Sequence, residues 1–248
     1  MFSDLPLPSL LALIGVLLFS LSWHEAAHAW MADRCGDMTA REQGRVTLNP
    51  LKHLHPFLSV ILPGLMIAFG LPPLAGGKPV PVDVRRLRNP SRDFMFVAVA
   101  GPLSNLVLGA LFGLVFLGCI WRGFFIEWIP NPYGPATPYV PSILGDDGGA
   151  NPWFFALQMG LLLNISLAIF NLLPIPPLDG SRIIGWILPG PLKMGWYRLD
   201  RYALFIIAGL YAALHFTGFG GYISGHIVNA WIGAADTIDD LAKRMIIS

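Results

Sequence analysis

The sequence predicts an all-α protein that crosses a membrane several times. Of its 248 residues, 54% are hydrophobic and only 12% are charged, whereas a soluble domain has roughly 25% charged residues. The chain also contains 22 prolines and 27 glycines, residues that interrupt helices and are tolerated in membrane proteins where neighbouring helices satisfy the backbone. Its net charge of +1 gives no indication of a nucleic-acid partner.

The apolar residues fall into five blocks, and a transmembrane helix needs about 20 such residues. The first, third and fourth blocks are long enough, the fifth is only just long enough, and the second is too short. In order, the blocks are Leu5–Ala32, Phe57–Leu71, Phe94–Ile120, Trp153–Leu173 and Tyr202–Phe219. We therefore expect about four full transmembrane helices in a single membrane-embedded domain that comprises residues 1–248.

The first block is expected to be a retained transmembrane helix rather than a signal peptide. The N-terminus has no basic segment, and no small-residue cleavage site precedes His24, whereas a secretory signal peptide has both features. We therefore treat this block as part of the mature fold.

Basic residues indicate which connecting segments face the cytoplasm. Cytoplasmic loops carry an excess of Lys and Arg, and three of the connecting segments are rich in them, whereas 121–152 contains a single one. The basic segments are 33–56, 72–93 and 174–201. This distribution predicts an integral protein of the cell (inner) membrane whose N-terminus lies outside.

The second block, Phe57–Leu71, is then expected to be a short re-entrant segment, because the segments on either side of it are both predicted to be cytoplasmic. Its central Pro63–Gly64 pair is compatible with an irregular backbone, which a membrane protein tolerates where protein buries it. Beyond the fifth block, Tyr222–Ala235 is a candidate for an additional C-terminal helix, and Asp236–Ile247 is a candidate for an amphipathic surface helix.

Two histidines and a glutamate are the only ionisable residues in the first apolar block: His24, Glu25 and His28. Ionisable groups are costly inside a membrane and usually mark a functional site. On a helix the two histidines lie about 40° apart and one turn removed. Both imidazoles could then bind one zinc ion, while Glu25 acts as general base toward a water molecule. This pattern predicts a metalloprotease site inside a membrane.

Other functions would also place polar groups in a membrane helix. A polar cluster can join helices that pack closely over small residues such as Ala26, Ala27 and Ala29. A membrane metal-ion transporter would need further acidic residues along a path, and the apolar blocks contain almost none besides Glu25. A non-catalytic metal-binding scaffold would not need Glu25 at all.

Asp179 is the candidate for a third metal ligand, because a catalytic zinc site usually has three protein ligands. It follows Pro174, Pro176 and Pro177, which interrupt the helix and free the chain to turn toward a metal. In the predicted orientation, Asp179 and the two histidines reach the same, cytoplasmic side. Leu-Asp-Gly is also a common helix-ending turn, so these residues alone leave both interpretations open.

Three motifs together resemble the site-2 protease family of intramembrane zinc metalloproteases (peptidase M50), in particular its small bacterial members without PDZ and CBS domains. The motifs are His24–His28, Gly101–Asn105 at the opening of a later span, and Asn171–Gly180. The resemblance implies one zinc ion per chain, bound by His24, His28 and Asp179. It also implies that Glu25 is the general base and that Asn171 binds the substrate or the oxyanion.

One residue departs from the family pattern. His55 lies in the segment Asn49–Pro56, where the resemblance leads us to expect an aspartate. His53 and His55 are candidates for auxiliary metal ligands. A hydrogen-bonded structural pair is the stronger expectation, because His-x-His in a loop lacks the spacing of a helical metal motif.

The sequence thus predicts an intramembrane zinc endopeptidase that cleaves a peptide bond within or near a transmembrane segment, as in regulated intramembrane proteolysis. Its expected partners are the lipid bilayer and a membrane-protein or signal-peptide substrate, without nucleic acid. Each connecting segment is shorter than the roughly 40 residues that a separate domain needs when no disulfide bonds or bound metals stabilise it. No appended peptide-binding or nucleotide-binding domain is therefore expected, and the active site is expected toward the cytoplasmic side.

Overall fold

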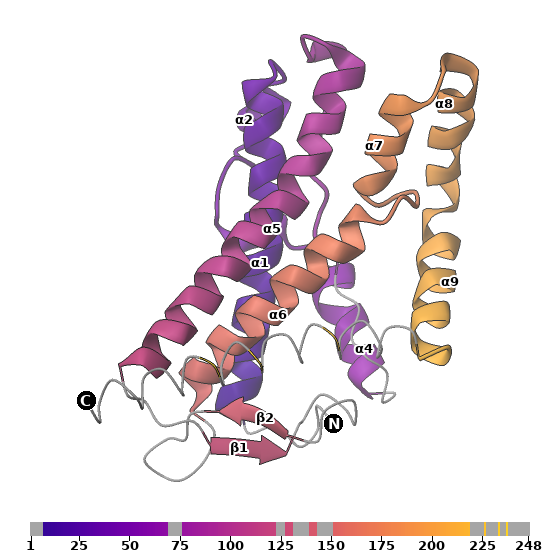
Figure 1. Ribbon diagram of the computed structural model, residues 1–248. Helices are drawn as coiled ribbons and strands as arrows, with labels where there is room; N and C mark the ends of the chain where they lie inside the picture. Colours follow the sequence, from indigo (N-terminus) through magenta and orange to yellow (C-terminus); the bar gives the residue numbers. More distant parts are fainter. Residues whose placement is uncertain are drawn as a thin grey trace. The chain divides into compact units, whose positions relative to one another are not determined.

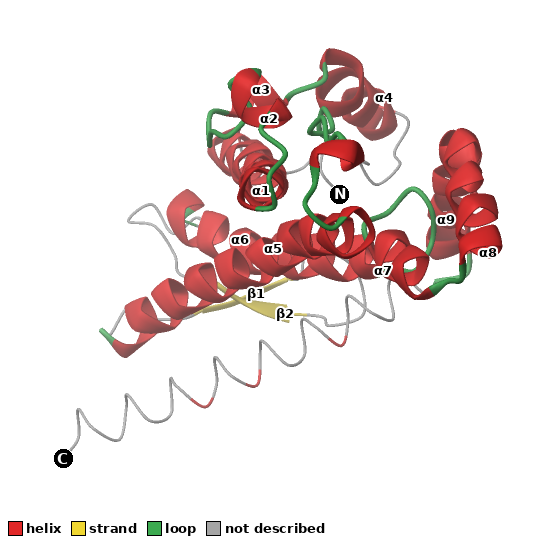
Figure 2. Ribbon diagram, turned by 90° about the horizontal axis from the view of Figure 1, so that it is seen from above, coloured by secondary structure: helices red, strands yellow, loops and turns green. Residues whose placement is uncertain are grey.

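The structure is a computed structural model that describes residues 7–68, 76–122, 127–130, 139–142 and 151–218, with the single positions 226, 233 and 237. Helices account for most of the described chain, as the red ribbons of Figure 2 show. The two expected C-terminal segments, Tyr222–Ala235 and Asp236–Ile247, lie outside the described residues except at those single positions.

Three helices in the described part of the chain are long and apolar enough to cross a membrane. They are α1 (Leu7–Arg34), α5 (Pro90–Trp121) and α6 (Pro152–Leu172), drawn from indigo to salmon in Figure 1. They coincide with the first, third and fourth apolar blocks of the sequence. At a rise of about 1.5 Å per residue, each is about as long as or longer than the roughly 30 Å hydrocarbon core.

The remaining helices are shorter. Before α5 the chain forms α2 (Thr39–Glu42), α3 (Pro50–His53), the π-helical turn η2 (Pro56–Ile61), α4 (Leu62–Ala68) and the 3-10 turn η3 (Val84–Arg86). After α6 it forms α7 (Gly180–Ile187), α8 (Gly190–Tyr197), the 3-10 turn η4 (Arg198–Tyr202) and α9 (Ala203–Phe216). The fifth apolar block is thus represented by α9, whose 14 residues extend about 21 Å, so the fourth full span stays a prediction.

A two-stranded hairpin adds a small sheet to the all-α fold that the composition predicts. Strand β1 (Glu127–Pro130) pairs antiparallel with β2 (Tyr139–Ser142), with Glu127 opposite Ser142. Both strands contain a proline, which sheets accept mainly at edges. Each strand is only four residues long, too short for an alternating pattern that would predict it.

The contacts within the chain divide it into two compact units. The first comprises residues 1–16, 108–163 and 208–248, and the second comprises 17–107 and 164–207. His24, Glu25, Asn171 and Asp179 all belong to the second unit, so the candidate site can be described within it. The expectation of a single domain stays a prediction.

Helix α1 ends just after the candidate site, and the chain turns there. Gly36 has a φ of +107°, a left-handed conformation that glycine adopts without steric cost and that commonly ends helices. The buried carboxylate of Asp37 then accepts hydrogen bonds from the backbone nitrogens of Thr39 and Asp83, at 3.0 and 2.7 Å. A small apolar cluster of Ala32, Leu87 and Val97 packs beside this turn and joins the end of α1 to the start of α5.

The two ends of the second apolar block lie side by side. Leu54, before the block, forms an antiparallel bridge with Gly77, which follows it. The backbone nitrogen of Gly76 donates to the carbonyl of Leu58 at 3.1 Å, and the Ser59 hydroxyl donates to the Gly76 carbonyl at 2.7 Å. The chain therefore returns to the place from which the block departs.

Candidate metal and active site

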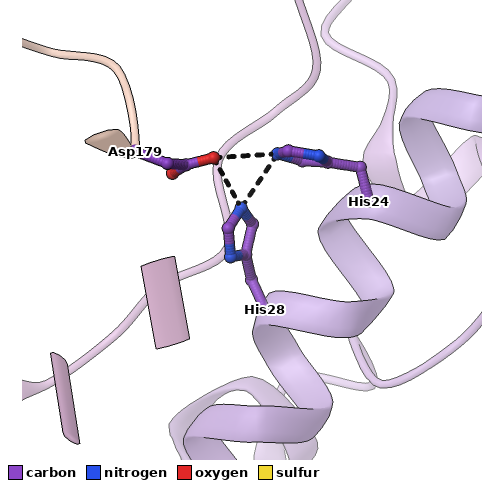
Figure 3. A group of neighbouring side chains, drawn as sticks. All are labelled: His24, His28 and Asp179. Atoms are coloured by element: carbon purple, nitrogen blue, oxygen red, sulfur yellow. Dashed lines mark hydrogen bonds and ion pairs between the residues drawn. The ribbon is translucent and has the colours of Figure 1, made fainter. Parts of the chain in front are cut away.

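Three side chains from two segments far apart in the sequence converge on one point (Figure 3). His24 and His28 lie one turn apart on α1, and Asp179 lies at the start of α7. The Nε2 atoms of the two histidines are 2.9 Å apart, and each is 3.2 or 3.3 Å from Oδ2 of Asp179. Among the described residues, these form the group of His, Cys, Asp and Glu side chains that is close enough to share a metal ion.

The outer nitrogen of each imidazole ring is occupied by a hydrogen bond. Nδ1 of His28 lies 2.7 Å from the backbone carbonyl of Val97, and Nδ1 of His24 lies 2.5 Å from the side-chain oxygen of Asn105. Because a carbonyl oxygen can only accept, each Nδ1 must carry the hydrogen. In the neutral ring, Nε2 is then a lone-pair acceptor, and both Nε2 atoms face Asp179.

With both rings neutral, the three converging atoms therefore present lone pairs to one another. His24 and His28 are 6% and 9% exposed, and Oδ2 of Asp179 is buried without a hydrogen-bond partner. Acceptors gathered in this way need a cation between them, and two imidazoles with one carboxylate are a ligand set of catalytic zinc sites. The residues of this site fit a zinc ion.

Asp179 is directed to the site by the way in which α7 begins. It occupies the N-cap position of α7 but makes no capping hydrogen bond with its side chain, although aspartate at this position usually caps the helix. The next residue, Gly180, packs against the end of α6, where an added Cβ would lie 2.2 Å from the carbonyl oxygen of Leu172. Glycine thus permits the close turn, and the aspartate side chain points to the histidines instead of its own helix.

Glu25 follows His24 on α1, and a neighbouring extended segment holds its carboxylate. Oε2 accepts a hydrogen bond from the backbone nitrogen of Val80 at 3.1 Å. A Cβ added at Gly77 would lie only 3.2 Å from Oε1, so the segment passes close to the carboxylate. The orientation of Glu25 therefore depends on residues 77–80.

Helix α5 approaches the imidazole rings through Gly101. A Cβ added there would lie 2.4 Å from Nε2 of His28 and 2.7 Å from Cε1 of His24. The next residue, Pro102, is fully buried inside the helix, where proline removes a backbone hydrogen bond and bends the helix. Gly101 thus forms part of the wall of the site beside the histidines.

Asn171 lies near the end of α6, and its side chain contacts its own helix. Its Nδ2 donates to the backbone carbonyl of Leu167 at 3.0 Å, and the side chain is half-buried. The expected role of Asn171 toward a substrate stays a prediction.

His53 and His55 have structural contacts. His53 is 1% exposed, and its Nε2 donates to the backbone carbonyl of Thr47 at 2.8 Å. His55 is exposed and precedes η2, where its Nδ1 accepts a hydrogen bond from the backbone nitrogen of Leu58 at 3.3 Å. An aspartate would cap this turn in the same way, which gives a physical reason why histidine can replace the expected aspartate.

Sequence reasoning missed the polar residues that surround the histidines. Asn105 on α5 and Asn164 on α6 are both fully buried and hydrogen-bonded to each other, and neither was assigned a role. Their signal was present, because an uncharged amide in the middle of an apolar span is costly unless it has a partner. The contact of Glu25 with Val80 could not be recognised in the sequence, since its donor is a backbone nitrogen that almost any residue would supply.

The chain is similar to known metalloprotease sequences. A family model described as "Peptidase family M50" matches residues 142–194, a range that contains Asp179. A Bacillus subtilis (strain 168) protein named "Putative zinc metalloprotease YwhC" is 33% identical over 225 residues, which cover 91% of this chain and 89% of that protein.

Two further relatives carry the same description and the name Rip2. The one from Mycolicibacterium smegmatis is 36% identical and the one from Mycobacterium tuberculosis (strain H37Rv) is 32% identical, each over 163 residues. These matches cover 66% of this chain and 52% of each relative, so the aligned part spans about half the length of the Rip2 proteins. No solved structure matches the chain significantly. With a relative aligned along nearly its whole length, the chain belongs to the site-2 protease family, peptidase family M50.

Proposed function

We propose that this protein is an intramembrane zinc endopeptidase that cleaves a membrane-protein or signal-peptide substrate within or near its transmembrane segment. The observation that carries the proposal is the convergence of three lone-pair atoms, from His24, His28 and Asp179, at one buried point. Membership of a peptidase family, three apolar helices and relatives described as zinc metalloproteases support it.

One zinc ion per chain would be held by His24, His28 and Asp179. When bound, zinc supplies Lewis acidity, which makes a water molecule more acidic and polarises the substrate carbonyl. The protein contributes the orientation of the ligands, because Val97 and Asn105 fix the two imidazole rings.

Glu25 would be the general base. It accepts the proton of the attacking water and then delivers it to the leaving nitrogen of the cleaved peptide bond. The hydrogen bond from Val80 keeps the carboxylate in one orientation, which reduces the reorganisation that proton transfer needs.

Asn171 would bind the substrate or the oxyanion that forms when water adds to the carbonyl. Its Nδ2 carries two N–H groups. One of these donates to Leu167 within α6, and the second would donate to the oxyanion, where a single hydrogen bond contributes substantially to the rate.

The active site would open toward the cytoplasmic side of the inner membrane. Basic residues on both sides of the second apolar block support this orientation, and so does the bridge between Leu54 and Gly77. A segment whose two ends lie together enters and leaves a membrane on one side. A substrate helix must unwind locally at the site, because its amides are otherwise bonded within the helix.

The test compares wild type with Glu25→Gln. Metal analysis of each detergent-solubilised protein gives zinc per chain, and cleavage is followed in cells on a panel of tagged single-span membrane proteins co-expressed with each variant. Glutamine keeps the shape and the hydrogen bond to Val80 but takes up no proton. We expect near wild-type zinc content and at least about a hundredfold slower cleavage, the lower end for the loss of a general base.

His24→Ala is the matched comparison and should lose zinc and cleavage together. Loss of zinc from Glu25→Gln would make Glu25 a ligand, and the roles would have to be reassigned. Wild-type cleavage by Glu25→Gln with zinc retained would falsify the proposed mechanism.

A further inference from the structure

A chain of side-chain hydrogen bonds runs from His24 through three helices. Asn105 on α5 lies 2.5 Å from Nδ1 of His24 through its Oδ1, and its Nδ2 donates to Oδ1 of Asn164 on α6 at 2.7 Å. Nδ2 of Asn164 donates in turn to the hydroxyl oxygen of Ser20 on α1 at 2.8 Å. The chain thus begins and ends on the same helix, α1, one turn apart.

A backbone carbonyl orients the amide of Asn105. Its Nδ2 lies 3.4 Å from the carbonyl oxygen of Ser20, which can only accept, and also donates to Oδ1 of Asn164. The Nδ2 group therefore points away from His24. Oδ1 of Asn105 is left to face the imidazole, and an oxygen there can only accept. His24 must then carry its hydrogen on Nδ1, with the lone pair of Nε2 directed at Asp179.

The three polar side chains of this hydrogen-bond chain are buried, which costs free energy that a contact serving packing alone would not need to spend. Ser20, Asn105 and Asn164 each have 0% exposure, in helices that are mostly apolar. Buried amides cost free energy unless they are hydrogen-bonded, and even then apolar side chains of similar shape would pack at least as well. A requirement at His24 explains why polar residues occupy all three positions.

We propose that Asn105 is a positioning residue for the metal ligand His24, and that Asn164 and Ser20 hold the Asn105 amide in the required orientation. The proposal rests on the proposed zinc site. Asn105 acts through the tautomer and the ring orientation of His24, because a neutral imidazole binds metal only through the nitrogen that lacks the hydrogen.

The first test measures zinc affinity by chelator competition on the full-length protein in detergent. Asn105→Leu has a similar size and no acceptor, and zinc binding should weaken about 10–100-fold, the usual effect of removing the partner of a ligating histidine. Ser22→Ala is the matched control. Ser22 is also fully buried on α1, but its hydroxyl donates to Leu18 of its own helix, so zinc affinity should not change.

Asn105→Asp should restore zinc affinity to within about threefold of wild type, within the usual context dependence of such contacts. The aspartate still presents an acceptor to His24. Asn164 can turn its amide over to donate to the new carboxylate, and the Ser20 hydroxyl can donate to the Asn164 oxygen. A role in packing alone would give Asn105→Leu the same affinity as Asn105→Asp.

The second test needs no metal. In zinc-free, 15N-histidine-labelled protein, the nitrogen chemical shifts of His24, assigned by comparison with His24→Gln, should show the hydrogen on Nδ1. In Asn105→Leu the two tautomers should become mixed. Asn164→Leu keeps Asn105 but removes the hydrogen bond that holds the Asn105 amide, so it should shift the same signals. It replaces Asn105→Leu in this test if that variant does not fold.

Two results would overturn the inference: wild-type zinc affinity in folded Asn105→Leu, or a His24 ring without a hydrogen on Nδ1 in the zinc-free wild type. Failure of the proposed zinc site is a separate result. It would appear as full zinc retention in His24→Ala, whereas the tautomer of His24 would still respond to Asn105.

Discussion

At Gly101, a hydrogen atom in place of a side chain leaves room for two imidazole rings on the neighbouring helix. The rings cannot move away freely, because hydrogen bonds from Nδ1 hold each of them. A methyl group at this position would therefore press on Nε2 of His28 and on Cε1 of His24. The identity of this residue matters for the site although glycine contributes no ligand atom.

Gly101→Ala should therefore weaken zinc binding by at least about tenfold, as loss of ligand orientation does. Gly118→Ala is the control on the same helix, because nothing lies within 4 Å of a Cβ added there and alanine favours a helix. Chelator competition on both variants measures the difference. Equal zinc affinities would show that the histidines do not occupy the described positions.

Asp179→Ala should sharply reduce zinc occupancy, because it removes the carboxylate oxygen that lies 3.2 and 3.3 Å from the two histidine nitrogens. Asp83→Asn is the control, since Asp83 bonds to Arg85 in a loop outside the membrane helices, where this arginine lowers the pKa of the carboxyl group. Metal analysis after gel filtration compares them. Stoichiometric zinc in Asp179→Ala would point to another ligand, such as His53.

At the scale of elements, α1, α5 and α6 were predictable because apolar residues fill long uninterrupted blocks. The hairpin β1–β2 was not, since its strands are short and contain prolines. Helices α7 and α8 were not predicted either. They follow the proline-rich segment after α6, where turn residues dominate the pattern and the helices have only eight residues each.

The bridge between Leu54 and Gly77 leads to a labelling prediction. In a Cys35→Ser, Cys119→Ser background, Lys52→Cys and Lys78→Cys should both react with a membrane-impermeant thiol reagent only from the cytoplasmic side, because the two exposed lysines flank the second apolar block. A cysteine at Tyr139 should react only from outside.

Burial raises the pKa of the Cys35 thiol, which slows its reaction at neutral pH, and replacing both native cysteines leaves the introduced cysteine as the thiol that is read out. If positions 52 and 78 were labelled from opposite sides, the second apolar block would cross the membrane. The predicted orientation of the later helices would then be reversed.

At the scale of the whole molecule, the candidate metal ligands come from two distant parts of the sequence. Two lie on α1, the first long helix, and the third lies in the segment that follows α6. Three motifs in sequence order were sufficient to predict His24, His28 and Asp179 as one group, and the structure brings them together. The neighbours of Glu25 and His24 could not be predicted, because they depend on how residues 77–80, α5 and α6 pack around α1.

Zinc should stabilise the folded protein, since it would bind an arrangement that the unfolded chain lacks. At a free zinc concentration of a hundred times Kd, the expected gain is about 2.7 kcal/mol. Thermal unfolding in detergent, with zinc or with a chelator, measures the shift in Tm. His24→Ala should show no shift, and an equal shift in that variant would locate the stabilising metal elsewhere.

The hydrogen-bond partners of the two histidines differ in whether a mutation can remove them. The partner of His28 is the backbone carbonyl of Val97, which every amino acid at that position would supply. The partner of His24 is the side chain of Asn105, which bonds to Asn164, and Asn164 bonds in turn to the Ser20 hydroxyl. Single substitutions at positions 20, 105 and 164 can therefore change the zinc affinity in steps through His24, while the backbone contact of His28 stays the same. Natural variation in metal affinity among relatives should concentrate at these three positions.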